Sequence, residues 1–307
     1  MVRRMEGDYM LDYRVETFLA VCQTKNYTRA AEQLNITQPA VSQHIKYLED
    51  YFGVKLFEIK GKQFSITSEG EEVYHLARIL KLNITKFKEH LLTNTGNKEI
   101  SLGATRTIGE FILPPIIAAY GKEYPSHIIK MKVDSAEELL EKVKYGEMDF
   151  AFIEGPFDET DFNVIEFMEE RYIPVCSPQF ELAGQEVTIE MLTKYPLILK
   201  EENRSSGSEM EQWLLQNNRN INNFKTVHLV NNLPIIKEMV KNNIGISFLY
   251  ETSVRKELLS GDLVSIPIKN YDVKRKFKFV YRKFSSYDEE YLSFFDFCDD
   301  KRRILCL

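Results

Sequence analysis

The chain has 307 residues, 44% of them hydrophobic and 12% aromatic, which is typical of a globular protein with two or three domains. Its net charge of −6 argues against a protein that coats nucleic acid with its whole surface. The first residues contain no apolar run, and the longest apolar stretch, Phe111–Tyr120, is about half a membrane span. We therefore expect no signal peptide and no membrane partner, and a cytoplasmic location.

The first third of the chain and the rest differ in their balance of charged residues. Residues 1–94 carry 13 Lys/Arg against 12 Asp/Glu, whereas residues 95–307 carry 27 against 34. A DNA contact would therefore depend on local geometry in the first third of the chain.

The four cysteines and five histidines are dispersed, with no CxxC or HExxH spacing. We expect reduced thiols, no metal site and no cofactor.

Three short helices are predicted at the start of the chain. Apolar residues at helical spacing predict the first over Leu11–Gln23. Asn26 is suited to N-cap the second helix. The third follows with Thr37 as its N-cap, Pro39 in its first turn, where a proline needs no amide partner, and Gly53 as its C-terminal stop.

The third helix presents the first set of candidate functional residues. Val41, Ile45 and Leu48 form its predicted core stripe. The other faces carry amide, hydroxyl, small and basic side chains, of the kinds that contact base edges, thymine methyl groups and phosphates in the major groove. These candidates are Thr37, Gln38, Pro39, Ala40, Ser42, Gln43 and Lys46. The spacing is equally compatible with an ordinary exposed polar face.

A β-hairpin is predicted after these helices. The β-rich runs Lys55–Ile59 and Phe64–Thr67 are joined by a short glycine-containing turn, an arrangement that indicates a β-wing. Lys60 and Lys62 flank the turn and could reach the minor groove or its phosphates, although lysines on a turn are often only solvated surface. Arg29, near the start of the second helix, is suited to a backbone phosphate.

A long amphipathic helix is predicted over Ser68–Leu92. Its apolar residues recur at intervals of three or four positions from Val73 to Leu91. Such a stripe needs a partner surface, most economically the same helix of a second copy, with burial against the same chain as the alternative. The polar segment Thr93–Asn97 then marks the predicted domain boundary.

Short β-rich segments alternate with helices in the rest of the chain, which predicts a largely parallel sheet. The first set comprises Ile100–Ala104, a helix near Leu113–Tyr124, Ile129–Val133, a helix near Ala136–Tyr145, and Phe150–Ile153. The second comprises Tyr172–Cys176, Leu197–Lys200, a helix over Ser206–Asn217, Lys225–Leu229, a helix around Leu233–Lys241, and Gly245–Leu249. The antiparallel-looking run Lys276–Arg282 and a final helix over Asp288–Phe297 are expected to return to the first lobe.

A small-molecule site is predicted where a strand meets a helix. Thr105 and Thr107 bring hydroxyl groups to a helix N-terminus, a geometry that favours an anion or a carboxylate. Arg106 between them either adds positive charge or points to solvent. The polar cluster Asn203–Ser206, which includes Arg204 and Ser205, and the pair Asn231–Asn232 also precede helices. Both either contact a ligand or serve as helix caps.

Several motifs stand in order along the chain. They are F-L-A-V, Y-T-R-A-A-E-Q-L, T-Q-P-A-V-S-Q-H-I-K-Y-L-E, F-G-V-K-L-F, S-I-T-S-E-G, I-S-L-G-A-T-R-T-I-G-E-F-I-L-P-P, V-K-N-N-I-G-I-S-F-L and L-L-S-G-D-L-V-S-I-P. Together they resemble the LysR-type transcriptional regulators, most densely over Leu11–Leu80 and more loosely to the C-terminus. Family members usually begin near the equivalent of Met10, so residues 1–9 are an extension or precede the true start.

The resemblance implies a multidomain fold. A mainly α winged helix-turn-helix domain would span 1–67, a linker and dimerisation helix 68–94, and a two-lobed α/β effector domain 98–307. That domain would resemble periplasmic binding proteins, with lobe I at about 98–171 and 270–307 and lobe II at about 172–269. The family places ligand contacts at the Thr105–Thr107 position, with Arg204, Ser205 and Asn231 as candidates for the opposite wall.

The resemblance also implies a function. The protein would regulate transcription by binding a pseudo-palindromic promoter site as a dimer or tetramer, under the control of a small-molecule effector and without catalysis. RNA polymerase is a further candidate partner. One alternative is a redox sensor that uses Cys176, which has no second cysteine nearby in sequence. An enzyme is disfavoured because the chain has no nucleophile elbow, P-loop or dinucleotide fingerprint.

Overall fold

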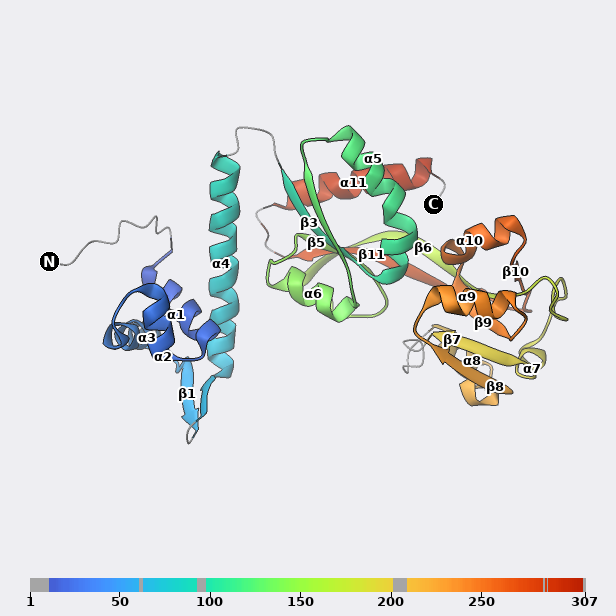
Figure 1. Ribbon diagram of the computed structural model, residues 1–307, viewed down its shortest axis with the longest axis horizontal. Coiled ribbons are helices and arrows are strands. Elements are labelled where there is room, and N and C mark those ends of the chain that lie inside the picture. Colours follow the sequence, from blue (N-terminus) through green and yellow to red (C-terminus); the bar gives the residue numbers. More distant parts are fainter. Residues whose placement is uncertain are drawn as a thin grey trace. The chain divides into compact units, whose positions relative to one another are not determined.

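The computed structural model describes residues 11–60, 63–92, 98–200, 209–283, 285 and 287–305. The chain forms two compact units (Figure 1). The first is built around helices α1–α4, and the second around a mixed sheet flanked by helices. Within the described residues, no helix is long and apolar enough to cross a membrane.

Helices α1 (Tyr13–Thr24), α2 (Tyr27–Leu34) and α3 (Gln38–Phe52) are separated by short turns. The predicted caps are present: the Asn26 side chain accepts from two backbone N–H groups at the start of α2, and the Thr37 hydroxyl accepts from the Ala40 N–H at 3.4 Å. Each helix ends at a residue in the left-handed conformation, namely Lys25, Asn35 and Gly53.

The three helices share a core of small and branched side chains. Ala30 and Val41 are fully buried, and Ala31, Ile45 and Leu48 are nearly so. The two alanines allow the helices to approach each other closely, because a larger side chain would hold the backbones apart. The predicted burial of Val41, Ile45 and Leu48 is thus confirmed, and the opposite face of α3 lies at the surface.

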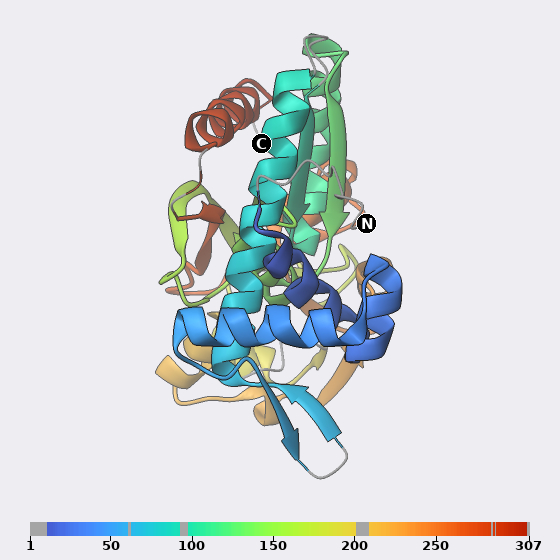
Figure 2. The same ribbon diagram turned by 90° about the vertical axis from the view of Figure 1, so that its left-hand side faces the viewer.

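A two-stranded wing follows α3 (Figure 2). Strands β1 (Phe57–Lys60) and β2 (Gln63–Ile66) pair antiparallel. The Phe57 and Phe64 rings stack with centroids 4.9 Å apart, and the Tyr27 ring meets Phe64 edge-on at 5.3 Å. These aromatic contacts fix the base of the wing to α2.

Helix α4 spans Ser68–Leu92, as predicted. Its first turn packs closely against the wing at Gly70, where an added Cβ would collide with the Leu56 carbonyl oxygen and lie 2.8 Å from an Ile66 side-chain carbon. A glycine at this position therefore sets the start of the long helix against the hairpin.

The sheet of the second unit has the strand order β4-β3-β5-β11-β6-β9-β7-β8, with β10 also paired to β6. Its first lobe contains β3 (Glu99–Ala104), β4 (Ile128–Val133), β5 (Phe150–Glu154), β11 (Lys274–Arg282) and the first part of β6 (Phe162–Cys176). The helical elements of this lobe are a π-helical turn η1 (Ile108–Ile112), α5 (Leu113–Glu123), α6 (Ala136–Lys144) and α11 (Asp288–Ile304).

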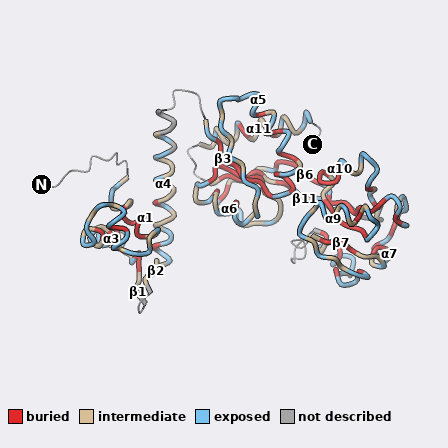
Figure 3. Tube along the Cα trace, in the orientation of Figure 1, coloured by how far each residue is buried: buried red, intermediate tan, exposed pale blue. Residues whose placement is uncertain are grey.

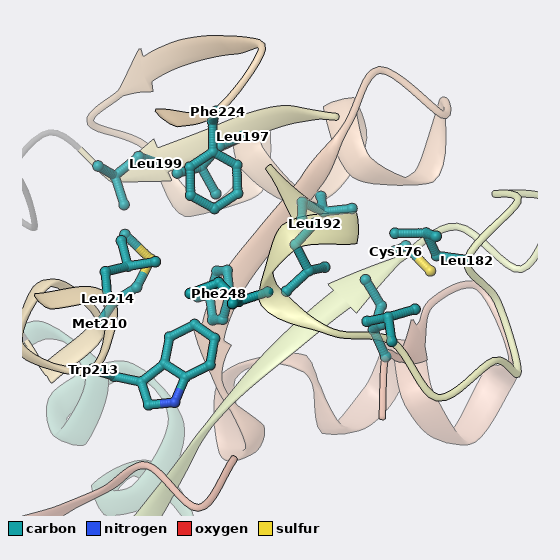
Figure 4. Close-up of a cluster of buried hydrophobic side chains, with 14 of the residues drawn as sticks. Cys176, Leu182, Leu192, Leu197, Leu199, Met210, Trp213, Leu214, Phe224 and Phe248 are labelled. Carbon is teal, nitrogen blue, oxygen red and sulfur yellow. The ribbon is translucent and has the colours of Figure 1, made fainter. Parts of the chain in front are cut away.

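The second lobe contains the last part of β6 with β7 (Pro196–Lys200), β8 (Thr226–Val230), β9 (Ile246–Tyr250) and β10 (Val264–Ser265). Its helices are α7 (Ile189–Leu192), α8 (Glu209–Gln216), a 3-10 turn η3 (Ile221–Asn223), α9 (Leu233–Lys241) and α10 (Glu251–Ser260). Its core surrounds Phe248 and the single tryptophan, Trp213 (Figure 4).

Several sequence expectations differ from the structure, although the antiparallel direction of Lys276–Arg282 is as predicted. The sheet is mixed, since β3–β5, β7–β8 and β7–β9 are parallel but β11 and β6 run antiparallel to their neighbours. Strand β6 begins ten residues before the predicted Tyr172, because its exposed Glu166 and Glu169 pair with lysines of β11 and hide the apolar pattern. Helix α10 was not predicted, and α11 continues to Ile304.

We expect Gly70→Ala to lower the melting temperature of the N-terminal unit, because the new Cβ overlaps the Leu56 backbone and costs about 1–3 kcal/mol. Gly121→Ala is the matched control. It lies within α5 with nothing within 4 Å of an added Cβ, so it should stabilise its own unit by about 0.5–1 kcal/mol. Differential scanning calorimetry measures both. Equal effects of the two changes would contradict the packing at Gly70.

Candidate functional site

The exposed face of α3 carries most of the predicted DNA contacts. Thr37, Gln38, Pro39, Gln43 and Lys46 are exposed, and Ala40 and Ser42 are partly buried. Arg29 is exposed in the first turn of α2. The structure therefore brings these residues together on a surface formed by the start of α2 and one face of α3.

Two of these side chains are already joined. The Gln38 Nε2 donates a hydrogen bond to the Ser42 Oγ at 3.0 Å, one turn along α3. The pair forms a single polar unit with fixed relative positions, which spacing alone did not predict. Gln43 and Lys46, also on α3, project from the helix as exposed side chains.

An aromatic and cationic cluster borders this face. The Arg14 guanidinium lies 3.6 Å from the centre of the Tyr47 ring and forms an ion pair with Asp12 at 3.3 Å. The Tyr13 ring meets the His44 ring edge-on at 4.9 Å. The sequence pattern did not indicate these contacts, because they join α1 to the middle of α3 and depend on how the helices pack.

His44 is held in one neutral form by its neighbours. The Thr17 hydroxyl donates its proton to the Tyr13 carbonyl oxygen at 3.0 Å, so the His44 Nδ1–H is the donor in the 2.9 Å contact with Thr17 Oγ1. Burial lowers the pKa of His44, and the nearby Arg14 guanidinium lowers it further. The imidazole is therefore uncharged at neutral pH.

The wing lysines are only partly placed. Lys60 ends β1, but its side chain is not described, and Lys62 lies outside the described residues. The backbone of the hairpin is fixed at its base, where the Thr67 hydroxyl donates to the Lys55 carbonyl oxygen at 2.5 Å. This bond closes the ends of the wing next to α4.

Most of helix α4 whose burial is described is exposed or half-buried (Figure 3), and its exposed residues include part of the apolar stripe. Leu76, Leu80 and Phe87 are 50%, 45% and 46% exposed, whereas Val73 packs against the helical core of the N-terminal unit. Large exposed apolar side chains along one helix are uncommon on an isolated protein and mark an interaction surface.

The predicted effector residues lie where β3 ends. Thr105 and Thr107 are 5% and 8% exposed, so their hydroxyls are buried. The Gly109 N–H donates to the Thr105 carbonyl oxygen at 2.8 Å, which places both threonines at the start of the helical segment that continues into α5. The arrangement of strand end, hydroxyls and helix start is the predicted one.

A carboxylate that the sequence pattern did not indicate joins this site. Glu154 is the last residue of β5, the strand parallel to β3. The Thr107 hydroxyl donates to Glu154 Oε1 at 3.3 Å, and the Glu154 N–H donates to Thr105 Oγ1 at 3.2 Å. The parallel pairing places the ends of the two strands side by side, and this register could not be read from sequence.

Arg106 connects the two lobes. Its guanidinium donates to the Asn231 carbonyl oxygen at 3.3 Å and forms an ion pair with Glu110 at 3.7 Å. The Asn232 side chain, rather than that of Asn231, caps α9 by accepting from the Ile235 N–H at 3.2 Å. Two predicted effector contacts, Arg106 and Asn231, thus meet. Arg204 and Ser205 lie outside the described residues.

Comparisons with known proteins match both units of the chain. The family model described as "LysR substrate binding domain" matches residues 94–303, and the one described as "Bacterial regulatory helix-turn-helix protein, lysR family" matches residues 13–71. The chain belongs to the LysR family. It is therefore a transcriptional regulator with a DNA-binding helix-turn-helix and an effector-binding domain, and it is not an enzyme.

Curated relatives that match this LysR-type chain over most of their length are transcriptional regulators. The HTH-type transcriptional regulator CysL of Bacillus subtilis is 30% identical over 270 residues, which are 87% of this chain and 89% of CysL. The HTH-type transcriptional activator CmpR of Synechocystis is 26% identical over 88% of this chain and 89% of its own length.

Solved structures show the same fold as the LysR-type chain. ArgP from Mycobacterium tuberculosis matches with a TM-score of 0.71 at 17% identity, covering 95% of this chain and 97% of that one. LysG from Corynebacterium glutamicum, solved with bound effector Arg, has a TM-score of 0.69 at 16% identity and the same coverages. Full-length OxyR from Pseudomonas aeruginosa has a TM-score of 0.64 at 21% identity and covers 95% of each chain.

The surroundings of Cys176 do not support the redox alternative. Cys176 is fully buried in the second lobe, and burial raises its pKa to about 11. Burial also raises the pKa of Cys22 to about 12. A thiol with such a pKa stays protonated at neutral pH, whereas the thiolate is the form that reacts with oxidants.

The lowered pKa of His44 predicts a pH-dependent stability of the DNA-binding unit. The unfolded chain takes up the proton at the ordinary histidine pKa, near 6.5, before the folded chain does. The stabilisation is complete above that value and is lost as the pH falls through the folded pKa. We expect the wild-type melting temperature to fall more steeply below about pH 6.5 than that of His44→Gln. Parallel melting curves across this range would contradict the assignment.

Proposed function

We propose that the chain binds a pseudo-palindromic promoter site as a dimer, through α3 and the wing of each copy, under the control of a small molecule bound at Thr105–Thr107. The observation that carries the DNA part is the capped helix α3, which buries Val41, Ile45 and Leu48 and exposes Gln43 and Lys46. Such a helix can enter the major groove because its polar face is free of core residues.

The exposed side chains suggest a division of roles. The Gln43 amide can donate to and accept from an adenine edge, and the Gln38–Ser42 pair presents a second polar group one turn earlier. Pro39 and Ala40 are suited to a thymine methyl group. Phosphate contacts are proposed for the remaining candidates, which are Arg29, Thr37, Lys46, Lys60 and Lys62.

The proposed dimer forms through α4. Its exposed Leu76, Leu80 and Phe87 provide an apolar surface for the same helix of a second copy. The two DNA-binding units of the dimer, each with little net charge, would then bind two half-sites at once. This raises the overall affinity for DNA without new contacts. Assembly to a tetramer and contact with RNA polymerase are further proposals. We place the protein in the cytoplasm, with the DNA it binds.

We propose the domain division 1–67, 68–94 and 98–307, with lobe I at about 98–171 and 270–307 and lobe II at about 172–269. The effector is proposed to bind between these lobes, with Thr105, Arg106 and Thr107 on one side and Arg204, Ser205 and Asn231 on the other. The bound arginine of LysG supports a small-molecule effector on this fold. For control, the effector must bind one arrangement of the subunits more tightly than another.

Mobility-shift titrations with the DNA upstream of the protein's own gene test the face of α3 that is proposed to contact DNA. Gln43→Ala should cost about 1–3 kcal/mol on the preferred site and relax base preference at one position. Lys46→Ala should weaken binding to all sequences and lower the slope of log affinity against log salt by about 1. Gln23→Ala, an exposed glutamine on α1, is the matched control. Wild-type binding without sequence selectivity would refute the proposed function.

Sedimentation measurements test the dimer. Leu80→Glu should raise the dimer dissociation constant more than about tenfold, because it places an unpaired carboxylate in an apolar interface. Thr85→Glu adds the same charge at an exposed position of α4 that lies off the apolar stripe and should leave assembly intact. If the two variants assemble equally well, α4 is not the dimer surface.

A further inference from the structure

Lys237 connects three helical elements where the two lobes meet. It stands on α9 of the second lobe, and its ammonium donates to both carboxylate oxygens of Glu257 on α10, at 3.0 and 3.1 Å. The same ammonium lies 5.2 Å from the centre of the Phe111 ring, which belongs to the π-helical turn η1 of the first lobe. This distance is within the roughly 6 Å over which the face of an aromatic ring attracts a cation.

The ion pair between α9 and α10 has little contact with solvent. The Lys237 and Glu257 side chains are only 13% and 15% exposed. Removing two charges from water offsets much of their mutual attraction, so such a pair contributes little net stability. Its effect is instead to hold the ammonium in one position, facing Phe111, where little water competes with the ring for the charge.

Phe111 is anchored in the first lobe through η1. Ile108 and Ile112, at the two ends of this turn, are fully buried. Gly109 packs closely against β4, since an added Cβ would lie 2.6 Å from Val133 Cγ2. The turn is therefore held by the sheet of its own lobe. Single π-helical turns of this kind occur frequently at functional sites.

Helix α10 is anchored in the second lobe and lies against η1. The Glu170 carboxylate of β6 accepts from the Thr252 N–H at 2.7 Å, which fixes the first turn of α10 to the strand that both lobes share. The ring of Phe111 and the ammonium of Lys237 thus belong to different lobes. Opening the lobes separates these two groups, whereas it leaves the Lys237–Glu257 pair together.

We propose that Lys237 and Phe111 form a latch between the lobes that favours the lobe arrangement of this structure. Glu257 holds the ammonium in place, so opening breaks the contact with the ring and not the ion pair. Because η1 directly follows Thr107, a displacement at the end of β3 reaches the latch within one helical turn. The inference goes beyond the proposed function, since it concerns the lobes themselves and needs no ligand.

Hydrogen–deuterium exchange of the full-length protein tests the latch, because opening of the lobes exposes amides of η1 and α10. Phe111→Leu removes the ring face but leaves the Lys237–Glu257 pair intact. It should raise exchange of these amides by on the order of two- to thirtyfold, the range that cation–π contacts of increasing burial span. Phe111→Tyr keeps a ring face for the ammonium and should exchange as the wild type does.

Phe297→Leu is the matched control for loss of an aromatic ring. It removes a ring that lies 4.9 Å from the Lys301 ammonium, so the same kind of contact is lost within the single helix α11. Exchange in η1 and α10 should then stay at the wild-type level. An equal rise in both leucine variants, or no rise in Phe111→Leu, overturns the latch.

A double-mutant cycle tests whether Lys237 is the partner of Phe111. Lys237→Met combined with Glu257→Gln removes both charges, so that neither is left unpaired in a poorly solvated position. In this background Phe111→Leu should change exchange of α10 by less than about twofold, because no ammonium faces the ring. If Phe111→Leu raises exchange by the same factor in both backgrounds, the ring acts through packing alone and the latch is overturned.

Discussion

The second unit depends on the continuity of strand β6 across both of its lobes. Residues Phe162–Arg171 pair with β11, and Tyr172–Val175 pair with β9. At the change of partner, the Glu170 carboxylate accepts from the Thr252 N–H at 2.7 Å in the first turn of α10, and burial raises its pKa. Because both lobes use the backbone hydrogen bonds of one strand, a change in their relative angle must deform this segment.

The continuity of β6 also bears on the contacts between the two lobes. Arg106 reaches Asn231 across them, and the Lys237 ammonium lies 5.2 Å from the centre of the Phe111 ring. Lys237 is also paired with Glu257 at 3.0 Å. A ligand that competes for Arg106 would therefore alter the Arg106–Asn231 contact between the lobes. Strand β6 limits the change in the angle between the lobes that can follow.

Local rules predicted the N-terminal unit well. The cap residues Asn26 and Thr37, the stop at Gly53 and the bounds of α4 follow from helix periodicity and capping chemistry. The order of elements in the second unit was also predictable, because buried strands and amphipathic helices alternate. The antiparallel direction of β11 was also predicted and is confirmed. The early start of β6 was not, since cross-strand ion pairs conceal the apolar alternation.

The residues of the candidate sites likewise fall into those that the local sequence indicates and those that it does not. Thr105 and Thr107 could be found from sequence because a strand end and a helix start lie within a few residues of them. Glu154 could not, because it joins them through the parallel register of β3 and β5, almost fifty positions along the chain. The Arg14–Tyr47 contact likewise depends on helix packing. Contacts between distant segments carry no local signal.

The left-handed residues that end α1, α2 and α3 have a consequence for how such regulators diversify. Lys25, Asn35 and Gly53 turn the backbone within one or two residues, so the spacing of the three helices is set by local chemistry alone. An insertion there would disturb the shared core, whereas a substitution on the outer face of α3 would not. The bases preferred by the proposed DNA-contacting face of α3 could therefore change by substitution, while the scaffold that holds this helix stays unaltered.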